Sequence, residues 1–252
     1  MDDLQLLRYS RHLLLNELGP DAQARFAAAH ALVVGTGGLG NPAAQFLGSA
    51  GIGTITLVDA DVVDLTNLQR QIMFAMDDVG TPKVQAAARR IAAINPEIRV
   101  VQVAQRVGDA ELAEHVAAAD VVLDCTDNFA TRHAINRACV AAGKPLVSGA
   151  AIRFDGQLAV YDTRDATSPC YHCLFGEGDD LEETRCATMG VFAPLVGIVG
   201  ATQAAEALKL VAGIGRSLAG RLLLIDALSM EWREVRVPRD PACPVCSSRS
   251  GA

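Results

Sequence analysis

The sequence has few aromatic residues and little positive charge. Phe, Trp and Tyr make up 4% of the 252 residues, so the core of a chain that is 50% hydrophobic has to be aliphatic. The formal net charge is −7, from 22 Lys and Arg against 29 Asp and Glu, and no long basic run forms a local cationic patch. Such a chain has no field that attracts a polyphosphate backbone. We therefore expect no nucleic-acid partner.

The sequence also lacks a signal-peptide pattern. Its start, Met1–Asp3, is acidic and leads into an amphipathic segment instead of a basic and then apolar one. Stretch 187–205 has no charged residue and is close to the length of about 20 residues that a membrane helix needs. It also holds three glycines and a proline. We expect a buried helix there, in a cytoplasmic protein that does not contact a membrane.

A glycine-rich turn between a strand and a helix is the strongest positive signal. An apolar strand at 31–34 runs into the turn, and a helical pattern follows it. The glycines are Gly35, Gly37, Gly38 and Gly40. Such a turn binds phosphate through backbone N–H groups at the helix N-terminus. A second strand, 54–58, ends at Asp59, where a carboxylate can accept hydrogen bonds from ribose. Alone, these residues predict a dinucleotide-binding Rossmann unit.

The residues that follow the second strand are unusual for a dinucleotide site. Asn67, Arg70 and Gln71 supply two amides and a cation. Lys83, directly after a Thr-Pro pair, supplies a second cation. A dinucleotide has only a pyrophosphate to neutralise, whereas a nucleoside triphosphate carries about four negative charges and gains from an added Arg and Lys. The combination therefore predicts a nucleoside-triphosphate site.

The order of strand and helix patterns predicts an α/β fold. A helix expected at 2–18 ends at Gly19-Pro20, ahead of the glycine turn. Strand and helix patterns then alternate as far as residue 148, which predicts a mainly parallel, doubly wound, Rossmann-like sheet. Thr81 is the expected cap of the helix that Lys83 opens. The elements expected after Asp59 are helix 83–94, strand 98–104, helix 109–118, strand 121–125, helix 128–142 and strand 145–148.

The pattern changes beyond Gly149. Asp155-Gly156, between apolar runs at 150–154 and 157–161, is a hairpin signal, so antiparallel strands extend the sheet. The aperiodic polar stretch 162–188 predicts a mobile loop. Helix 194–211 and strands 221–226 and 231–237 follow. We interpret 1–252 as one domain with an N-terminal helix at 1–20, a nucleotide-binding portion at 31–148, and the extension, loop and a metal site at 149–246.

Four of the seven cysteines form two pairs with metal-ligand spacing. They are Cys170, Cys173, Cys243 and Cys246, with two residues between the sulfurs of each pair. Two such pairs predict a tetrahedral Zn²⁺ site. Their separation of about 70 residues indicates that the metal ties the C-terminal tail to the central loop. The alternatives are disulfides, which are rare in the cytosol, and buried free thiols. Four thiolates leave no open position, so the zinc is expected to be structural.

Asp127 and Asn128 have two interpretations. They follow strand 121–125 at the carboxyl edge of the sheet, where open α/β proteins bind ligands. A carboxylate there can hold Mg²⁺ against a triphosphate. Alternatively, one of the two residues simply caps the next helix.

Arg11 and the histidines carry no signal of their own. Taken alone, Arg11 is a solvated residue on an amphipathic helix. The histidines show no ligand or catalytic spacing, so we expect them on the surface or in the core. They are His12, His30, His115, His133 and His172.

Together, the glycine turn, the cations, Asp127-Asn128 and the two cysteine pairs resemble the ThiF/MoeB/HesA proteins, relatives of the adenylation half of ubiquitin-activating enzymes. The resemblance spans residues 8–246. It implies a homodimer that binds ATP and Mg²⁺ and adenylates the C-terminal Gly-Gly carboxylate of a ubiquitin-like sulfur carrier protein. The roles it implies are ribose binding by Asp59, phosphate binding by Asn67, Arg70 and Lys83, magnesium binding near Asp127, and a reach of Arg11 to the partner's ATP.

The resemblance leaves the carrier open between MoaD of the molybdopterin branch and ThiS of the thiamine branch. Cys186 lies where the thiamine branch has a cysteine that can bond the carrier, but the molybdopterin branch can have one too. Segments 149–153 and 190–194 are closer to the molybdopterin branch. No rhodanese segment follows Cys246, so a separate sulfur donor protein is expected.

Two other classes of function account for fewer of these residues. An NAD-linked oxidoreductase rests on the glycine turn and Asp59 alone, and it gives Arg70 and Lys83 nothing to do. A zinc-stabilised binding module without catalysis does not explain why Arg70, Lys83 and Asp127 are all present.

Overall fold

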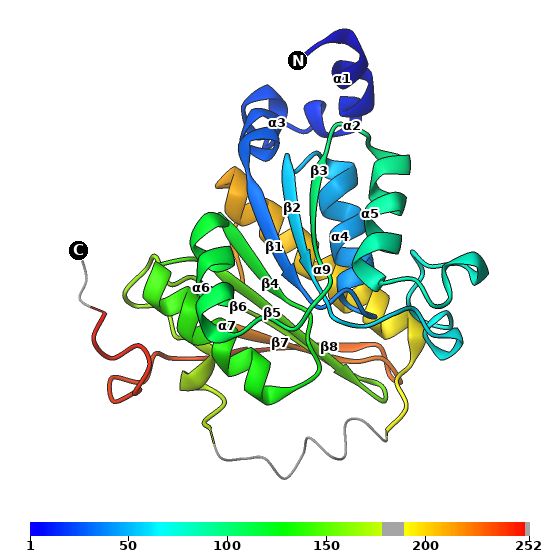
Figure 1. The fold of residues 1–252 in the computed structure, drawn as a ribbon. Helices are drawn as coiled ribbons and strands as arrows, with labels where there is room; N and C mark the ends of the chain where they lie inside the picture. The colour runs from blue at the N-terminus through cyan, green and yellow to red at the C-terminus, as the bar shows by residue number, and fades with distance from the viewer. Residues whose placement is uncertain (178–188, 250–252) are drawn as a thin grey trace.

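The computed structural model describes residues 1–177 and 189–249 and is built around one eight-stranded sheet (Figure 1). The strands are β1 His30–Val34, β2 Thr54–Val58, β3 Arg99–Val103, β4 Val121–Asp124, β5 Leu146–Ile152, β6 Asp155–Tyr161, β7 Arg221–Asp226 and β8 Glu231–Arg236. Their order is β3-β2-β1-β4-β5-β6-β7-β8. Strands β1 to β5 pair in parallel, and β6 to β8 are added antiparallel. The expected mainly parallel α/β fold with an antiparallel extension is confirmed.

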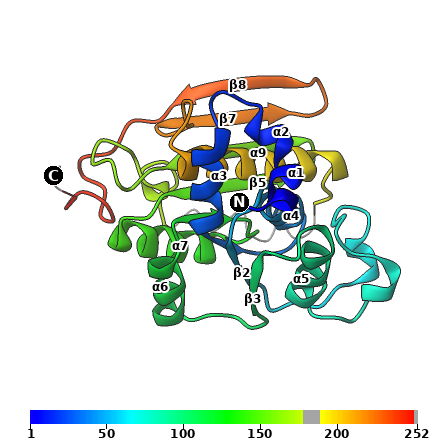
Figure 2. The ribbon, with the colours of Figure 1, turned by 90° about the horizontal axis from the view of Figure 1, so that it is seen from above.

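Helices cover both faces of the parallel part of the sheet. They include α4 Gly40–Ala50, α5 Lys83–Ile94, α6 Asp109–Ala118, α7 Phe129–Ala142 and α9 Ala193–Ala212. Side chains alternate along β1, so Ala31 and Val33 join the core under α4, α5 and α9, while Leu32 and Val34 join the core under α6 and α7. Figure 2 shows these two layers on opposite sides of the sheet. Burial on both faces explains why β1 reads as a continuous apolar run.

The N-terminal region differs from the single helix expected at 2–18. The chain forms α1 Asp3–Arg8, α2 Ser10–Leu13 and α3 Gly19–Ala28. Gly19-Pro20 therefore begins a helix where we predicted an end, because proline in the first turn loses no intrahelical hydrogen bond. The cap of α5 is also shifted by one residue, since Pro82 and not Thr81 is the N-cap, although the bounds of that helix are as predicted.

The sheet order places a topological switch point at the carboxyl ends of β1 and β4. The chain turns to opposite sides after these two neighbouring strands, and ligands bind at such a switch point. The loops that leave the strands touch there, because the Cys125 N–H donates to the Val34 carbonyl at 2.9 Å. Gly35 has φ +88°, and a Cβ there would lie 2.7 Å from the Cys125 carbonyl oxygen. Only glycine fits this close approach.

Helix α9 is the element of the described chain that is long and apolar enough to cross a membrane, and half of its most apolar window is buried in the fold. It packs on α4, β5 and β6. Its Gln203 amide donates to the carbonyls of Asp124 and Val147, which joins the helix to two core strands. The buried helix expected at 194–211 is this one.

Candidate functional site

The glycine turn opens directly into α4. A Cβ on Gly40 would lie 1.9 Å from the Gly35 carbonyl oxygen, so the turn closes only with glycine at both positions. Within the described residues, no side chain caps the N-terminus of α4. The Asn41 N–H donates to the Gly37 carbonyl at 2.9 Å and Pro42 has no N–H, so the free positive end of the helix dipole is what favours an anion there.

Asp59 is fixed at the end of β2. One carboxylate oxygen accepts from the backbone N–H of Thr36 at 2.7 Å and from its hydroxyl at 2.9 Å. The other accepts from the Asp61 N–H at 2.9 Å. The carboxylate is thus held against the glycine turn, with lone pairs left for further donors.

The buried Asn41 connects the glycine turn to the segment that contains Asn67 and Gln71. Its amide nitrogen donates to the Thr36 carbonyl at 2.6 Å, and its oxygen accepts from the Met73 N–H at 2.8 Å. Gln71 consequently lies over Gly37 with 2% of its surface exposed. The buried Gln71 Oε1 has no hydrogen-bond partner within the described chain. A buried unpaired acceptor at a proposed ligand site fits a donor supplied by the ligand.

Lys83 reaches the same edge from the first turn of α5. The residue is 6% exposed, and its ammonium pairs with Asp61 at 2.8 Å. Since Asp61 also donates its N–H to Asp59, an unbroken chain of hydrogen bonds runs from Thr36 through Asp59 and Asp61 to Lys83. A predicted cation and a predicted ribose ligand are therefore neighbours.

Asn67 is the last residue of a short 3₁₀ turn, η1 Leu65–Asn67, and Arg70 follows this turn. The Arg70 guanidinium donates to the Thr66 carbonyl at 3.1 Å. The Asn67 side-chain oxygen accepts from the Asp64 N–H at 3.1 Å, which fixes the turn. A cavity of about 240 Å³ lies beside Arg70, between Pro42 at the start of α4 and Pro194 at the start of α9. Arg70 is thus close to the helix that the glycine turn opens.

Asp127 and Asn128 lie in the loop after β4, beside the glycine turn. Asp127 is exposed, whereas the Asn128 side chain accepts from the Thr131 N–H at 2.9 Å and caps α7. The capping alternative is therefore confirmed for Asn128. The loop is braced from below by Arg132, whose buried guanidinium donates to the Thr126 carbonyl at 2.7 Å.

Arg11 is far from this edge in its own chain. Next to α2, Tyr9 lies against Gly51 at the C-terminal end of α4 and accepts a hydrogen bond from Asn95 at the C-terminal end of α5. The site lies at the N-terminal ends of these helices, which are 11 and 12 residues long and therefore about 16–18 Å in length. Figure 1 shows α1 and α2 at the amino ends of the strands. The described chain does not bring Arg11 to Lys83.

Our sequence reasoning missed four residues that organise the site. They are Thr36, Asn41, Asp61 and Arg132. Asp61 was detectable, because a second acidic residue two positions after a ribose carboxylate has a candidate partner in Lys83. Arg132 gave no signal, because a charged residue in an amphipathic helix is ordinarily solvated.

The four cysteines with metal-ligand spacing meet in space. The Sγ–Sγ distances are 3.9 Å for Cys170–Cys173, 3.7 Å for Cys170–Cys243 and 3.5 Å for Cys173–Cys246. A disulfide needs sulfurs about 2 Å apart, whereas a tetrahedral zinc with Zn–S bonds of about 2.3 Å places its sulfurs about 3.8 Å apart. The cluster therefore fits zinc and excludes disulfides between these residues.

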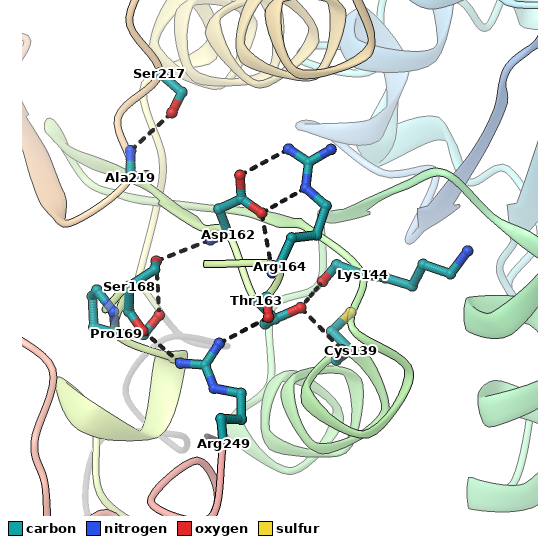
Figure 3. Close-up of polar contacts among 10 residues, drawn as sticks. All are labelled: Cys139, Lys144, Asp162, Thr163, Arg164, Ser168, Pro169, Ser217, Ala219 and Arg249. Carbon is teal, nitrogen blue, oxygen red and sulfur yellow. Dashed lines mark hydrogen bonds and ion pairs between the residues drawn. The ribbon is translucent and has the colours of Figure 1, made fainter. Parts of the chain in front are cut away.

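The tail and the loop that carry these cysteines are also joined by arginines. Arg239 donates to the Cys246 carbonyl. Arg249 donates to the carbonyls of Thr163 and Ser168, in the segment before Cys170 (Figure 3). Burial raises the pKa of the Cys170 and Cys173 thiols. Burial acts in the same direction on Cys246, but hydrogen bonds, the largest with Cys173, outweigh it and lower its pKa to about 7.

The stretch expected as a mobile loop, 162–188, contains a 3₁₀ turn, η3 Tyr171–Cys173, within its described part. Cys186 lies in 178–188, outside the described residues.

Comparisons with known proteins agree with this architecture. The sequence model of the ThiF family matches residues 9–245. The chain is 45% identical to the molybdopterin-synthase adenylyltransferase of Escherichia coli K12, over 98% of each chain. It is also 45% identical to the sulfur carrier protein ThiS adenylyltransferase of the same strain, over 98% of this chain and 97% of the relative. A crystal structure of E. coli MccB with ATP superposes with a TM-score of 0.84 at 27% identity, over 95% of this chain and 73% of that one.

Proposed function

Because the chain belongs to the ThiF family and is an adenylyltransferase, we propose that it uses ATP to adenylate the C-terminal Gly-Gly carboxylate of a ubiquitin-like sulfur carrier protein, releasing pyrophosphate. The observation that carries this proposal is the line of contacts from Thr36 through Asp59 and Asp61 to Lys83. The Asp59 carboxylate and the Lys83 ammonium thus share one edge, beside an uncapped helix N-terminus, which supports their proposed roles as ribose and phosphate ligands. A nicotinamide enzyme needs no buried lysine there.

The cations suit an attack of one anion on another. The carrier's carboxylate has to approach the α-phosphate of a polyanion, so positive charge must be spread over the leaving pyrophosphate. We assign this to Lys83 and Arg70. No general base is required, because a carboxylate is already ionised at neutral pH. None of the hydrogen bonds that join Thr36, Asp59, Asp61 and Lys83 involves a histidine.

The remaining side chains are assigned to binding. Asp59 accepts from the ribose, and the unpaired Gln71 oxygen accepts from a donor of the nucleotide. Asn67 supplies amide donors, as does Asn128 through the amide nitrogen that its capping contact leaves over. The exposed Asp127 carboxylate is a hard oxygen ligand, which Mg²⁺ prefers. Bound Mg²⁺ would neutralise phosphate charge. The four-cysteine cluster is assigned to a structural zinc.

We further propose a homodimer in which Arg11 completes the site of the partner. The N-terminal helices and the turn after them expose five leucines, each with 44–73% of its surface accessible. They are Leu4, Leu6, Leu7, Leu14 and Leu15. So many large apolar side chains in one short segment support a covering surface from a second copy. They flank Arg11, which is exposed and distant from its own site.

Subunit mixing tests the role of Arg11. Arg11→Ala and Lys83→Ala chains, each inactive alone, are expected to regain activity when mixed, because in the heterodimer one site loses both residues and the other loses neither. The measurement is pyrophosphate exchange after subunit exchange has been verified with differently tagged chains. An Arg70→Ala and Lys83→Ala mixture is the matched control without recovery, if both residues serve their own chain's site. Absence of recovery in the first mixture would place Arg11 outside the partner's site.

Carrier-dependent exchange of labelled pyrophosphate into ATP tests the proposed activity. We expect exchange with a carrier that ends in Gly-Gly and none when that tail is removed, because the terminal carboxylate is the nucleophile. Comparing a MoaD-like with a ThiS-like carrier decides the branch, and we propose the MoaD-like one. No exchange with either carrier, together with tight NADH binding, would instead support the oxidoreductase.

Other assignments stay with this proposal. We propose a cytoplasmic enzyme that works with a separate sulfur donor protein and has neither nucleic acid nor membrane as a partner. The net charge of −7 supports the exclusion of nucleic acid. A covalent role for Cys186 also stays a proposal, and a reducible adduct between enzyme and carrier that Cys186→Ser abolishes would support it.

A further inference from the structure

A second group of metal-ligating side chains lies next to the four-cysteine cluster. Its members are His133 on α7, His172 in η3 and Glu177 at the end of the described segment before residue 178. One ligand atom from each lies within 4.8 Å of the others. His133 lies about 40 residues before His172 in the sequence, which is why the histidines showed no ligand pattern. Our expectation that all histidines serve only the surface or the core overlooked this convergence.

The two histidines face one another in a largely enclosed position. Their ring centroids are 5.6 Å apart at an interplanar angle of 65°. His133 is 5% exposed, and its Nδ1 lies 3.8 Å from Glu177 Oε1. The Nδ1 of His172 is buried and has no hydrogen-bond partner within the described residues. A buried imidazole nitrogen normally has a partner, and a metal ion can be that partner.

The backbone around the group is held in place by other contacts. Asn136 of α7 accepts from the Tyr171 N–H at 2.9 Å and donates to the Cys170 sulfur at 3.7 Å. His133 also packs edge-on against the Tyr171 ring, with centroids 5.2 Å apart. The Asn136 contacts therefore join helix α7 to the η3 region independently of the proposed ligands. Sites on such fixed elements keep their geometry before the metal arrives.

We propose that His133, His172 and Glu177 form a second divalent transition-metal site, separate from the four thiolates. Two imidazoles and one carboxylate are a ligand set for Zn²⁺ and related ions such as Co²⁺, and three protein ligands leave a position for water. The 3₁₀ turn then serves two sites, with Cys170 and Cys173 in the thiolate cluster and His172 in the second site. The proposal does not depend on adenylation.

The guanidinium of Arg137 competes with a metal ion for Glu177 and therefore lowers the metal affinity of the site. Arg137, one turn after His133 on α7, pairs with Glu177 Oε1, the same oxygen that faces His133. A bound metal has to displace this guanidinium. The second site is therefore weaker than the thiolate site and is expected to lose its ion during purification in chelator, while the thiolate zinc stays. This competition also predicts a variant that binds metal more tightly.

The test is titration of the purified zinc-loaded protein with Zn²⁺ alone, measured by calorimetry and by metal analysis after equilibrium dialysis. The wild type is expected to take up one further ion per chain. Glu177→Gln and His172→Phe are each expected to weaken this second binding at least about 10-fold. Arg137→Gln is expected to strengthen it, because the carboxylate is then released from its ion pair.

His115→Phe is the matched control. His115 is partly buried and lies 3.9 Å from Glu111 on α6, so it is also a histidine near a carboxylate, but it lacks a third ligand in the described chain. Its replacement is expected to leave the stoichiometry and affinity unchanged. Because Glu177 is exposed, the Glu177→Gln chain should fold normally, and thermal unfolding checks this.

Two results would overturn the site. One is the absence of a second equivalent of Zn²⁺ in both the wild type and Arg137→Gln. The other is uptake that is equal in the wild type, Glu177→Gln and His172→Phe. Co²⁺ titration provides an independent readout, since an ion on nitrogen and oxygen ligands lacks the thiolate-to-cobalt absorption that a cysteine-bound ion shows. A thiolate spectrum for the second equivalent would place that ion on cysteines and refute the proposal.

Discussion

Lys83→Ala is expected to lower carrier-dependent pyrophosphate exchange by at least about 100-fold, which corresponds to about 2.7 kcal/mol of transition-state stabilisation. The ammonium is buried, and its partner Asp61 is itself largely exposed. In ATP-bound protein a phosphate can compete for the lysine, because water can solvate the exposed Asp61 carboxylate when the ion pair breaks. The contact strengthens as charge develops on the leaving pyrophosphate, so the rate should fall more than the affinity for ATP.

Stability should change little in this variant. The Asp61 carboxylate left behind is solvated, so no uncompensated buried charge is created. The unfolding midpoint and the dissociation constant for ATP, measured beside the exchange rate, separate loss of chemistry from loss of fold or of binding.

Lys144→Ala is the matched control for the loss of one positive charge. Lys144 precedes β5, at the amino end of the parallel strands, and lines a separate cavity of about 560 Å³ with Arg25 and Arg164. We expect its exchange rate to equal that of the wild type. If Lys83→Ala retained a rate comparable to Lys144→Ala, Lys83 would be a structural residue that pairs with Asp61 and does not act on phosphate.

Cys173→Ser is expected to release zinc and to lower the midpoint of thermal unfolding by about 10 °C. The metal closes a loop of about 70 residues between the two cysteine pairs, and a cross-link over such a loop stabilises a fold by about 4 kcal/mol in the chain-entropy model. For a chain of this size each kcal/mol shifts the midpoint by about 2–4 °C. Adenylation by the molecules that stay folded should persist, because no cysteine of the cluster contacts the nucleotide edge residues in the described structure.

Zinc per chain and thiol titration measure this effect. The wild type should retain about one ion on the thiolates after chelator treatment. Cys139→Ala is the matched control, because Cys139 is a buried cysteine of α7 in the apolar core and outside the cluster. It should lose stability without losing zinc. Four freely titratable thiols and less than about a tenth of an ion per wild-type chain would show that the cluster is metal-free.

The chain itself determined the elements whose signals are local. The glycine turn, the bounds of α5 and the position of Asp59 at the end of β2 all follow from spacing within a few residues. Hydrophobic periodicity and turn-forming residues are local features, so they can be recognised in the sequence alone. The parallel sheet followed from alternation, because a parallel crossover requires an intervening helix. The four cysteines form a long-range contact that could nevertheless be predicted, because the spacing within each pair is a local signal.

Only the tertiary structure decided which side chains meet across elements. Asp61 binds Lys83, Asn41 joins the turn to Met73, and His133 meets His172. These contacts depend on strand register and helix packing, which place residues of different elements together without leaving a periodic pattern. The same reason explains the wrong prediction at Gly19-Pro20. The residue types predicted the end of a helix there, whereas in the fold they begin α3. It also explains the position of Arg11. Packing places the segment with Arg11 at the C-terminal ends of α4 and α5, whereas Lys83 lies at the N-terminal end of α5.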